Sequence, residues 1–127
     1  MAKITRSTQK IFADSLVASN NIAQFGSLKA GAVAYSKDPA AIQTTEYLNG
    51  WAAALESNKA PPLQDLNSLF FLLSRQLAYT MQAGVPEYDS GTTYYIGSIV
   101  SDGAGRLYVS KTDDNVGNAL TRLANWK

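Results

Sequence analysis

The clearest hydrophobic pattern in the chain lies between residues 63 and 77. Apolar side chains recur there at intervals of three and four residues, at Leu63, Leu66, Phe70, Leu73 and Leu77. This spacing is the a/d pattern of a coiled-coil seam, and it predicts a helix that begins directly after Pro61-Pro62. The pattern lasts only about two heptads. Because Leu69, Phe71 and Leu72 widen the apolar surface, several faces of this helix must be covered.

A second helix is predicted before it, from residue 38 to the polar run at 57–60. Asp38 can accept hydrogen bonds from the first amides of the helix, and Pro39 fits its first turn. Apolar residues then gather on one side, at Ile42, Tyr47, Leu48, Trp51 and Leu55. Gly50 weakens this helix. The two helices form a predicted hairpin over residues 38–83, which either packs inside an oligomer, expected to be a trimer, or covers itself in a monomer.

The segments on either side of the hairpin differ from it. Residues 1–37 are rich in small residues, and we predict an irregular arm there that is either mobile or ordered against a neighbouring chain. Residues 84–127 carry short β-type stretches separated by turns rich in Asp, Asn and Gly. The expected fold class is α+β: an N-terminal extended arm, a helical hairpin with a short coiled-coil-like seam, and a small C-terminal antiparallel β module. A module this short has no disulfides to stabilise it, so it is expected to pack against the helices or against copies of itself. The fold is expected to be oligomeric.

Composition narrows the possible chemistry. The 127 residues include no Cys and no His, which removes the best transition-metal ligands and the Ser–His and Cys–His nucleophile systems. The net charge of +1 provides no basic field for nucleic acid, and no apolar stretch is long enough to cross a membrane. We therefore expect no enzymatic activity, no cofactor, no metal, no nucleic-acid partner and no membrane insertion.

The acidic and basic residues have simple explanations. Two groups of turn residues offer oxygen ligands for a hard cation: Asp113-Asp114 with Asn115, and Asp102 with Asp89. They lack the EF-hand spacing, and turn chemistry explains them. Asp65 and Glu56 are candidates for a glycosidase carboxylate pair, but Asp65 is more simply a first-turn residue favoured by the helix dipole. Lys3, Arg6 and Lys10 are too scattered to indicate a nucleic-acid site.

The second half of the chain contains a series of five motifs, which are EYD at residues 87–89, TYYIGSIV at 93–100, GRLYVS at 105–110, NVGN at 115–118 and NWK at 125–127. Together these motifs resemble a module common in tailed-bacteriophage tail fibre proteins. Residues 49–51 and 60–70 also resemble the region upstream of that module in such fibres. The resemblance covers about two thirds of the chain, and it rests on the order and spacing of the motifs together.

The resemblance implies a structural virion protein of a tail fibre or spike, usually trimeric, that serves host attachment. Such a protein is synthesised in the host cytoplasm and functions in the virion. Residues 1–37 would then be a virion-anchoring segment that contacts other phage tail or virion proteins. The β module is also similar to chitin-binding-type carbohydrate-binding modules, although this chain offers only Val85 or Tyr88 where those commonly open with Trp. This similarity implies a host surface glycan as partner and an alternative function, a carbohydrate-binding module on a helical oligomerisation base.

Two sets of candidate site residues follow. The oligomer interface is expected at Trp51, Leu63, Leu66, Phe70, Leu73 and Leu77. The candidate carbohydrate contacts are Tyr88, Tyr94, Tyr95, Tyr108 and Trp126, because aromatic rings pack well against the apolar faces of sugars. Packing roles compete with sugar contact, since strand alternation places Tyr94 and Tyr95 on opposite faces and Trp126 is suited to seal a small core.

Overall fold

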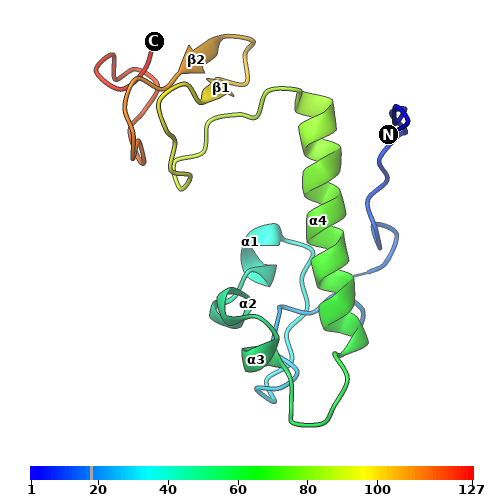
Figure 1. The fold of residues 1–127 in the computed structure, drawn as a ribbon. Coiled ribbons are helices and arrows are strands. Elements are labelled where there is room, and N and C mark those ends of the chain that lie inside the picture. The colour runs from blue at the N-terminus through cyan, green and yellow to red at the C-terminus, as the bar shows by residue number, and fades with distance from the viewer. Residues whose placement is uncertain (18) are drawn as a thin grey trace. The chain divides into compact units, whose positions relative to one another are not determined.

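The computed structural model describes residues 1–17 and 19–127. The chain divides into two compact units, Met1–Ala78 and Tyr79–Lys127, and the boundary falls within the long helix α4 (Leu63–Ala83) (Figure 1). Among the described residues there are one long helix, three short helices and one two-stranded antiparallel sheet, and most side chains are exposed or half-buried. The predicted mixture of helices with a small antiparallel sheet is therefore confirmed.

The helical part of the first unit begins where the sequence predicts it. α1 (Pro39–Ile42) is capped by Asp38, whose carboxylate accepts a 3.0 Å hydrogen bond from the amide of Ala40. The single helix expected from residue 38 is instead three short ones, because α2 (Thr45–Asn49) and α3 (Trp51–Ala54) follow α1 separately.

Local backbone chemistry explains these interruptions. The hydroxyl of Thr44 accepts a 3.2 Å hydrogen bond from the amide of Tyr47 and thereby starts a new helix. Gly50 has a φ of +64°, a conformation outside the right-handed helix, and it separates α2 from α3. The expected helical hairpin is thus a cluster of short helices beside one long helix.

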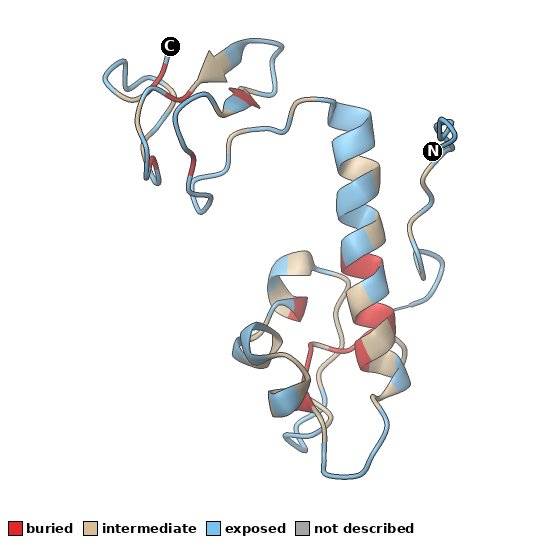
Figure 2. Cartoon of the chain, in the orientation of Figure 1, coloured by how far each residue is buried: buried red, intermediate tan, exposed pale blue. Residues whose placement is uncertain are grey.

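α4 starts immediately after Pro61-Pro62, as predicted, and runs for 21 residues. Its buried residues are Asp65, Asn67, Ser68, Phe71 and Leu72. All of them lie in the N-terminal half of the helix, and Figure 2 shows no buried position after them on α4. The C-terminal half of α4 therefore has little cover from its own unit.

The segment that follows Ala18, which itself lies outside the described residues, differs from the extended arm predicted for residues 1–37. Ile22 and Phe25 are buried, and a β-bridge joins Ala23 to Tyr35. The amide of Phe25 donates to the carbonyl of Ile42 at 3.3 Å, so the segment is tied to α1. Ala23 is buried as well, and its backbone amide is bonded within the first unit, so residues 22–26 form core rather than arm, whereas residues 29–33 are exposed. Residues 1–8 are exposed.

The second unit is built around a short hairpin. β1 (Ile99–Ser101) pairs antiparallel with β2 (Leu107–Val109), with Val100 opposite Tyr108. Glu87 bridges to Ser101 in parallel orientation, and Ser110 bridges to Trp126 in antiparallel orientation. Short segments around residues 87 and 126 thus cover both edges of the sheet.

The core of the second unit contains Tyr94, Val100 and Trp126, with Tyr88, Tyr108 and Leu120 packed against it. Two polar residues, Ser110 and Asn115, are buried beside this core. The side-chain amide of Asn115 donates to the Ser110 hydroxyl at 2.9 Å, so neither side chain is left without a partner.

Candidate interaction surface on the long helix

α4 exposes a continuous row of apolar side chains. Four residues of the predicted seam are more than half exposed: Leu63 (66%), Phe70 (52%), Leu73 (59%) and Leu77 (55%). Leu66 is half-buried. Residues three and four apart lie on the same face of a helix, so these five side chains form one stripe, here called the α4 seam. A contiguous exposed apolar stripe indicates an interaction surface, whereas isolated exposed leucines do not.

The buried side of α4 lies opposite the α4 seam. Leu72 is nine residues from Leu63, which at 3.6 residues per turn places it on the other side of the helix. Phe71 and Leu72 contact Ile22 and Ile42 in the core of the first unit. The helix therefore buries one apolar face within its own unit and leaves most of the other exposed, at Leu63, Phe70, Leu73 and Leu77.

The borders of the α4 seam carry no charge. The bordering positions are Asn67, Leu69, Ser74 and Gln76. The sequence of α4 contains only two charged residues, Asp65, which is buried, and Arg75. In coiled coils the bordering charges select the partner and its orientation. A second copy of α4 placed along this stripe would meet no like charge there.

Phe12 also lies against the α4 seam, and sequence reasoning missed it. Its ring packs edge-on against Phe70 with the centroids 5.4 Å apart. Ala13 follows with a φ of +60°, which turns the chain, and the Asp14 carboxylate is 3.7 Å from the Lys37 ammonium. No local periodicity signals a contact between residues so far apart in sequence. Phe12 extends the exposed apolar surface beyond the helix itself.

Trp51, which was predicted to belong to the same interface, is not part of the α4 seam. Its ring is 5.1 Å from that of Phe25, and Phe25 also packs edge-on against Tyr47 at 5.7 Å. The structure therefore gives Trp51 a packing contact inside the first unit. Sequence reasoning grouped Trp51 with the interface because its partner, Phe25, belongs to the segment that was expected to be an arm.

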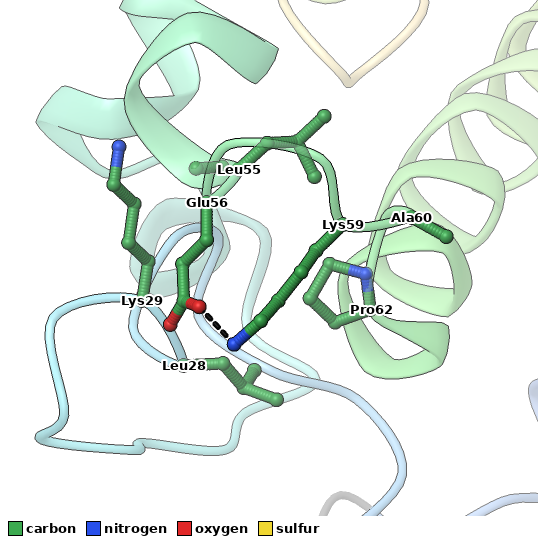
Figure 3. A pocket seen from close by; sticks show the side chains of 8 residues that line it. Leu28, Lys29, Leu55, Glu56, Lys59, Ala60 and Pro62 are labelled. Atoms are coloured by element: carbon green, nitrogen blue, oxygen red, sulfur yellow. Dashed lines mark ion pairs between the residues drawn. The ribbon is translucent and has the colours of Figure 1, made fainter.

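Two of the depressions lined by described residues lie in the first unit. One, of about 90 Å³, is lined by Leu28, Lys29, Ala54, Leu55, Glu56, Lys59, Ala60 and Pro62. Figure 3 shows the ion pair of Glu56 with Lys59 within it, and the hydrogen bond from Lys59 holds the pKa of Glu56 below its ordinary value. Asp65 does not line this depression, so no carboxylate pair of the glycosidase type is assembled there.

The second depression, of about 240 Å³, runs beside α4. It is lined by Pro39, Gln43, Tyr47, Leu72, Leu73, Arg75 and Gln76. Leu73 belongs to both this depression and the α4 seam. The depression thus broadens the uncovered surface of α4 toward α1 and α2.

Asp65 is fully buried in the first turn of α4. Its Oδ1 accepts a long 3.4 Å hydrogen bond from the amide of Gly26, and its Oδ2 has no hydrogen-bond partner among the described residues. Burial raises the pKa of Asp65, and the Gly26 amide opposes this only in part. The sequence predicted the first-turn position of Asp65 but not its burial.

The aromatic residues of the second unit are divided between core and surface. Tyr94 and Trp126 are buried, and the indole of Trp126 donates to the carbonyl of Asn118 at 2.9 Å. Tyr88 is half-buried and stacks on Tyr94 with the centroids 6.0 Å apart. Tyr95 is exposed, so the alternation predicted for Tyr94 and Tyr95 is confirmed. Tyr94 and Trp126 therefore serve the core and are not available as a flat sugar platform.

The acidic turn residues accept local hydrogen bonds. Asp102 accepts from the amides of Ala104 and Arg106, and the first of these bonds makes the largest contribution to lowering the pKa of Asp102. Asp113 accepts from the amide of Ile96 at 3.1 Å. Within residues 1–17 and 19–127, no group of three or more acidic side chains is arranged to hold a metal ion.

No protein-family model, curated protein sequence or solved structure matches this chain. Within the described part of the chain, no helix has the length and apolar character needed to span a membrane.

Proposed function

We propose that this chain is a structural, non-enzymatic virion protein of a phage tail fibre or spike. In this proposal it forms a homotrimer through the α4 seam and joins the fibre to the particle for host contact. It is synthesised in the host cytoplasm and acts in the virion, without a cofactor. The observation that carries the proposal is the uncovered a/d stripe of α4, which adds to the resemblance of residues 38–127 to tail fibre proteins.

The extent of the apolar surface favours more than two chains. Leu69 borders the α4 seam on one side, and Phe12 packs against Phe70. A two-helix seam covers only the a and d positions, whereas a third helix also covers the residues that border them. Each Å² of apolar surface removed from water contributes about 25 cal/mol, so a wider contact also gives a more stable assembly.

The N-terminal segment is proposed to contact another virion protein. Residues 1–8 are exposed, and two of them, Met1 and Ile4, are large apolar residues. The packed part of the first unit starts later, with Ile11 and Ala13 against the core cluster. Exposed apolar residues ahead of an anchored point suit a segment that orders on a partner.

The alternative function, a carbohydrate-binding module on a helical base, has less support. With Tyr94 and Trp126 in the core, Tyr95, at 54% exposure, is the most exposed of the five candidates, and Tyr88 and Tyr108 are half-buried. Sugar-binding faces generally need a larger aromatic surface than one ring provides. Glycan binding by a monomeric chain would support this alternative over the fibre proposal.

The first test is the solution mass of the full chain, measured by light scattering during size-exclusion chromatography. The proposal predicts a trimer, and it predicts that Leu73→Glu with Leu77→Glu reduces the mass to that of one chain. Both positions are exposed in the single chain, so the variant should keep its fold, which circular dichroism checks. The matched control is Leu48→Glu, because Leu48 of α2 is 82% exposed but lies outside the α4 seam.

The virion assignment needs a separate measurement. Antibodies raised against the chain should label purified phage particles at the tail when those particles come from cells that express this protein. A wild-type protein that stays monomeric at high concentration would overturn the oligomer. Particles that carry no label and no copy of the chain by mass spectrometry would overturn the virion role.

A further inference from the structure

The first two turns of α4 hold the segment 20–26 through a set of hydrogen bonds. The amide of Ala23 donates to the carbonyl of Gln64 at 3.4 Å, and the side-chain amide of Asn67 donates to the carbonyl of Asn21 at 2.9 Å. The bond from Gly26 to Asp65 is the one that depends on an ionisable group. This contact lies on the buried side of α4, away from the α4 seam.

The surroundings of Asp65 suit a neutral carboxyl group better than a carboxylate. An ionised carboxylate offers about four acceptor sites, and burying it without hydrogen bonds is costly. Asp65 is 0% exposed, receives one long hydrogen bond on Oδ1 and has no described partner on Oδ2. Protonation of Oδ2 removes the charge while Oδ1 still accepts from Gly26.

No neighbouring cation offsets a charge on Asp65. The segment 22–27, α1, α3 and residues 63–73 of α4 contain no other titratable side chain. α2 contributes Glu46, which lies against Gly26 so closely that a Cβ added to Gly26 would be 2.6 Å from the Glu46 Cβ. Lys29, the lysine nearest to Gly26 in sequence, is exposed and donates to the carbonyl of Ala52 at 3.5 Å. Lys59, the lysine nearest to Asp65 in sequence, is exposed and pairs with Glu56. The charged residue that these elements place beside Gly26 is therefore acidic, and it meets Gly26 through its Cβ and Cγ.

We propose that Asp65 is a proton-dependent latch, which in its neutral form holds the segment 20–26 against α4 and on ionisation loosens that contact. The latch is independent of the trimer and of the virion role. It would make the folding of the first unit respond to pH in a protein without histidine.

The direction of the pH response follows from linkage. Burial raises the pKa of Asp65, so the folded chain holds this proton more tightly than the unfolded chain does. The stability that the neutral group contributes is fully present below the unfolded pKa and is lost as the pH rises through the folded pKa. At neutral pH, Asp65→Asn should therefore be at least as stable as wild type.

The test is a pH titration of the Gly26 amide, followed by ¹H–¹⁵N NMR of the full chain. In wild type the Gly26 resonance should titrate with a midpoint above 3.8, the ordinary value for aspartate. The exchange protection of the Ala23 and Gly26 amides should fall as that midpoint is passed, relative to Asp65→Asn measured at the same pH. The matched control is Glu46→Gln, which removes the other carboxyl at the junction and should keep the raised midpoint.

The outcomes are distinct. Loss of the Gly26 titration in Asp65→Asn and its retention in Glu46→Gln would support the latch. A wild-type midpoint at or below 3.8 would overturn it without any variant. So would an Asp65→Asn protein whose Ala23 and Gly26 protection follows the same pH dependence as wild type. None of these results depends on the mass of the assembly.

Discussion

The backbone amide of Phe12 donates a 2.7 Å hydrogen bond to the hydroxyl of Ser74, which lies 62 residues later in the chain. The same hydroxyl donates to the carbonyl of Phe70 at 2.6 Å, one helical turn earlier in α4. The Ser74 hydroxyl therefore bonds to a carbonyl of its own helix and, at the same time, holds the backbone of the N-terminal segment. This contact places the Phe12 ring on Phe70, which is a residue of the α4 seam.

Replacing Ser74 with Ala should free the N-terminal segment while leaving α4 intact. The lost bond contributes about 0.5–1.5 kcal/mol, but the hydroxyl also competes with the helix's own hydrogen bonds, so global stability should change little. The protection of the Phe12 amide from hydrogen exchange should be lost, whereas amides in the middle of α4 should keep theirs. Ser57→Ala, in the exposed turn after α3, is the control and should change neither. Unchanged protection at Phe12 in Ser74→Ala would contradict this contact.

Gly26 is the position where a side chain should be tolerated least. A Cβ there would lie 2.6 Å from the Glu46 Cβ and 2.9 Å from its Cγ, and the φ of +81° strains any other residue. Gly26→Ala should lower the free energy of unfolding by about 2–6 kcal/mol, since backbone strain and overpacking each cost about 1–3 kcal/mol. Chemical denaturation followed by the fluorescence of Trp51, which packs on Phe25, measures this loss.

Gly31 provides the comparison that separates the two causes. Its φ is +75°, close to that of Gly26, but nothing lies within 4 Å of a Cβ added there. Gly31→Ala should therefore cost only the backbone term, about 1 kcal/mol. Equal losses for the two variants would show that crowding against Glu46 contributes nothing.

Asn115 should be the most sensitive polar residue of the second unit. Its side chain is buried, donates to the Ser110 hydroxyl at 2.9 Å and accepts from the Asn118 side chain at 2.9 Å. Asn115→Ala leaves those partners unsatisfied, which should cost about 2–4 kcal/mol. The indole N–H resonance of Trp126 reports the loss, because Trp126 donates to the carbonyl of Asn118. Thr121→Ala, at an exposed position of the same unit, should leave that resonance unchanged.

The sequence by itself determined the features that arise within a few residues. The cap at Asp38, the start of α4 after Pro61-Pro62 and the opposite orientation of Tyr94 and Tyr95 all follow from local backbone chemistry and periodicity. The α4 seam was predicted in the same way, because a spacing of three and four places its residues on one face whatever surrounds the helix.

Only the tertiary structure decided which faces are covered and by what. Ile22 and Phe25 belong to the core because α1 and α4 supply partners for their segment, which no local pattern indicates. Phe12 reaches Phe70 through a bond between residues far apart in the chain. The burial of Asp65 likewise depends on Gly26. Periodicity shows which side chains share a face, whereas burial depends on long-range contacts that each cost chain entropy and are fixed only when the whole unit packs.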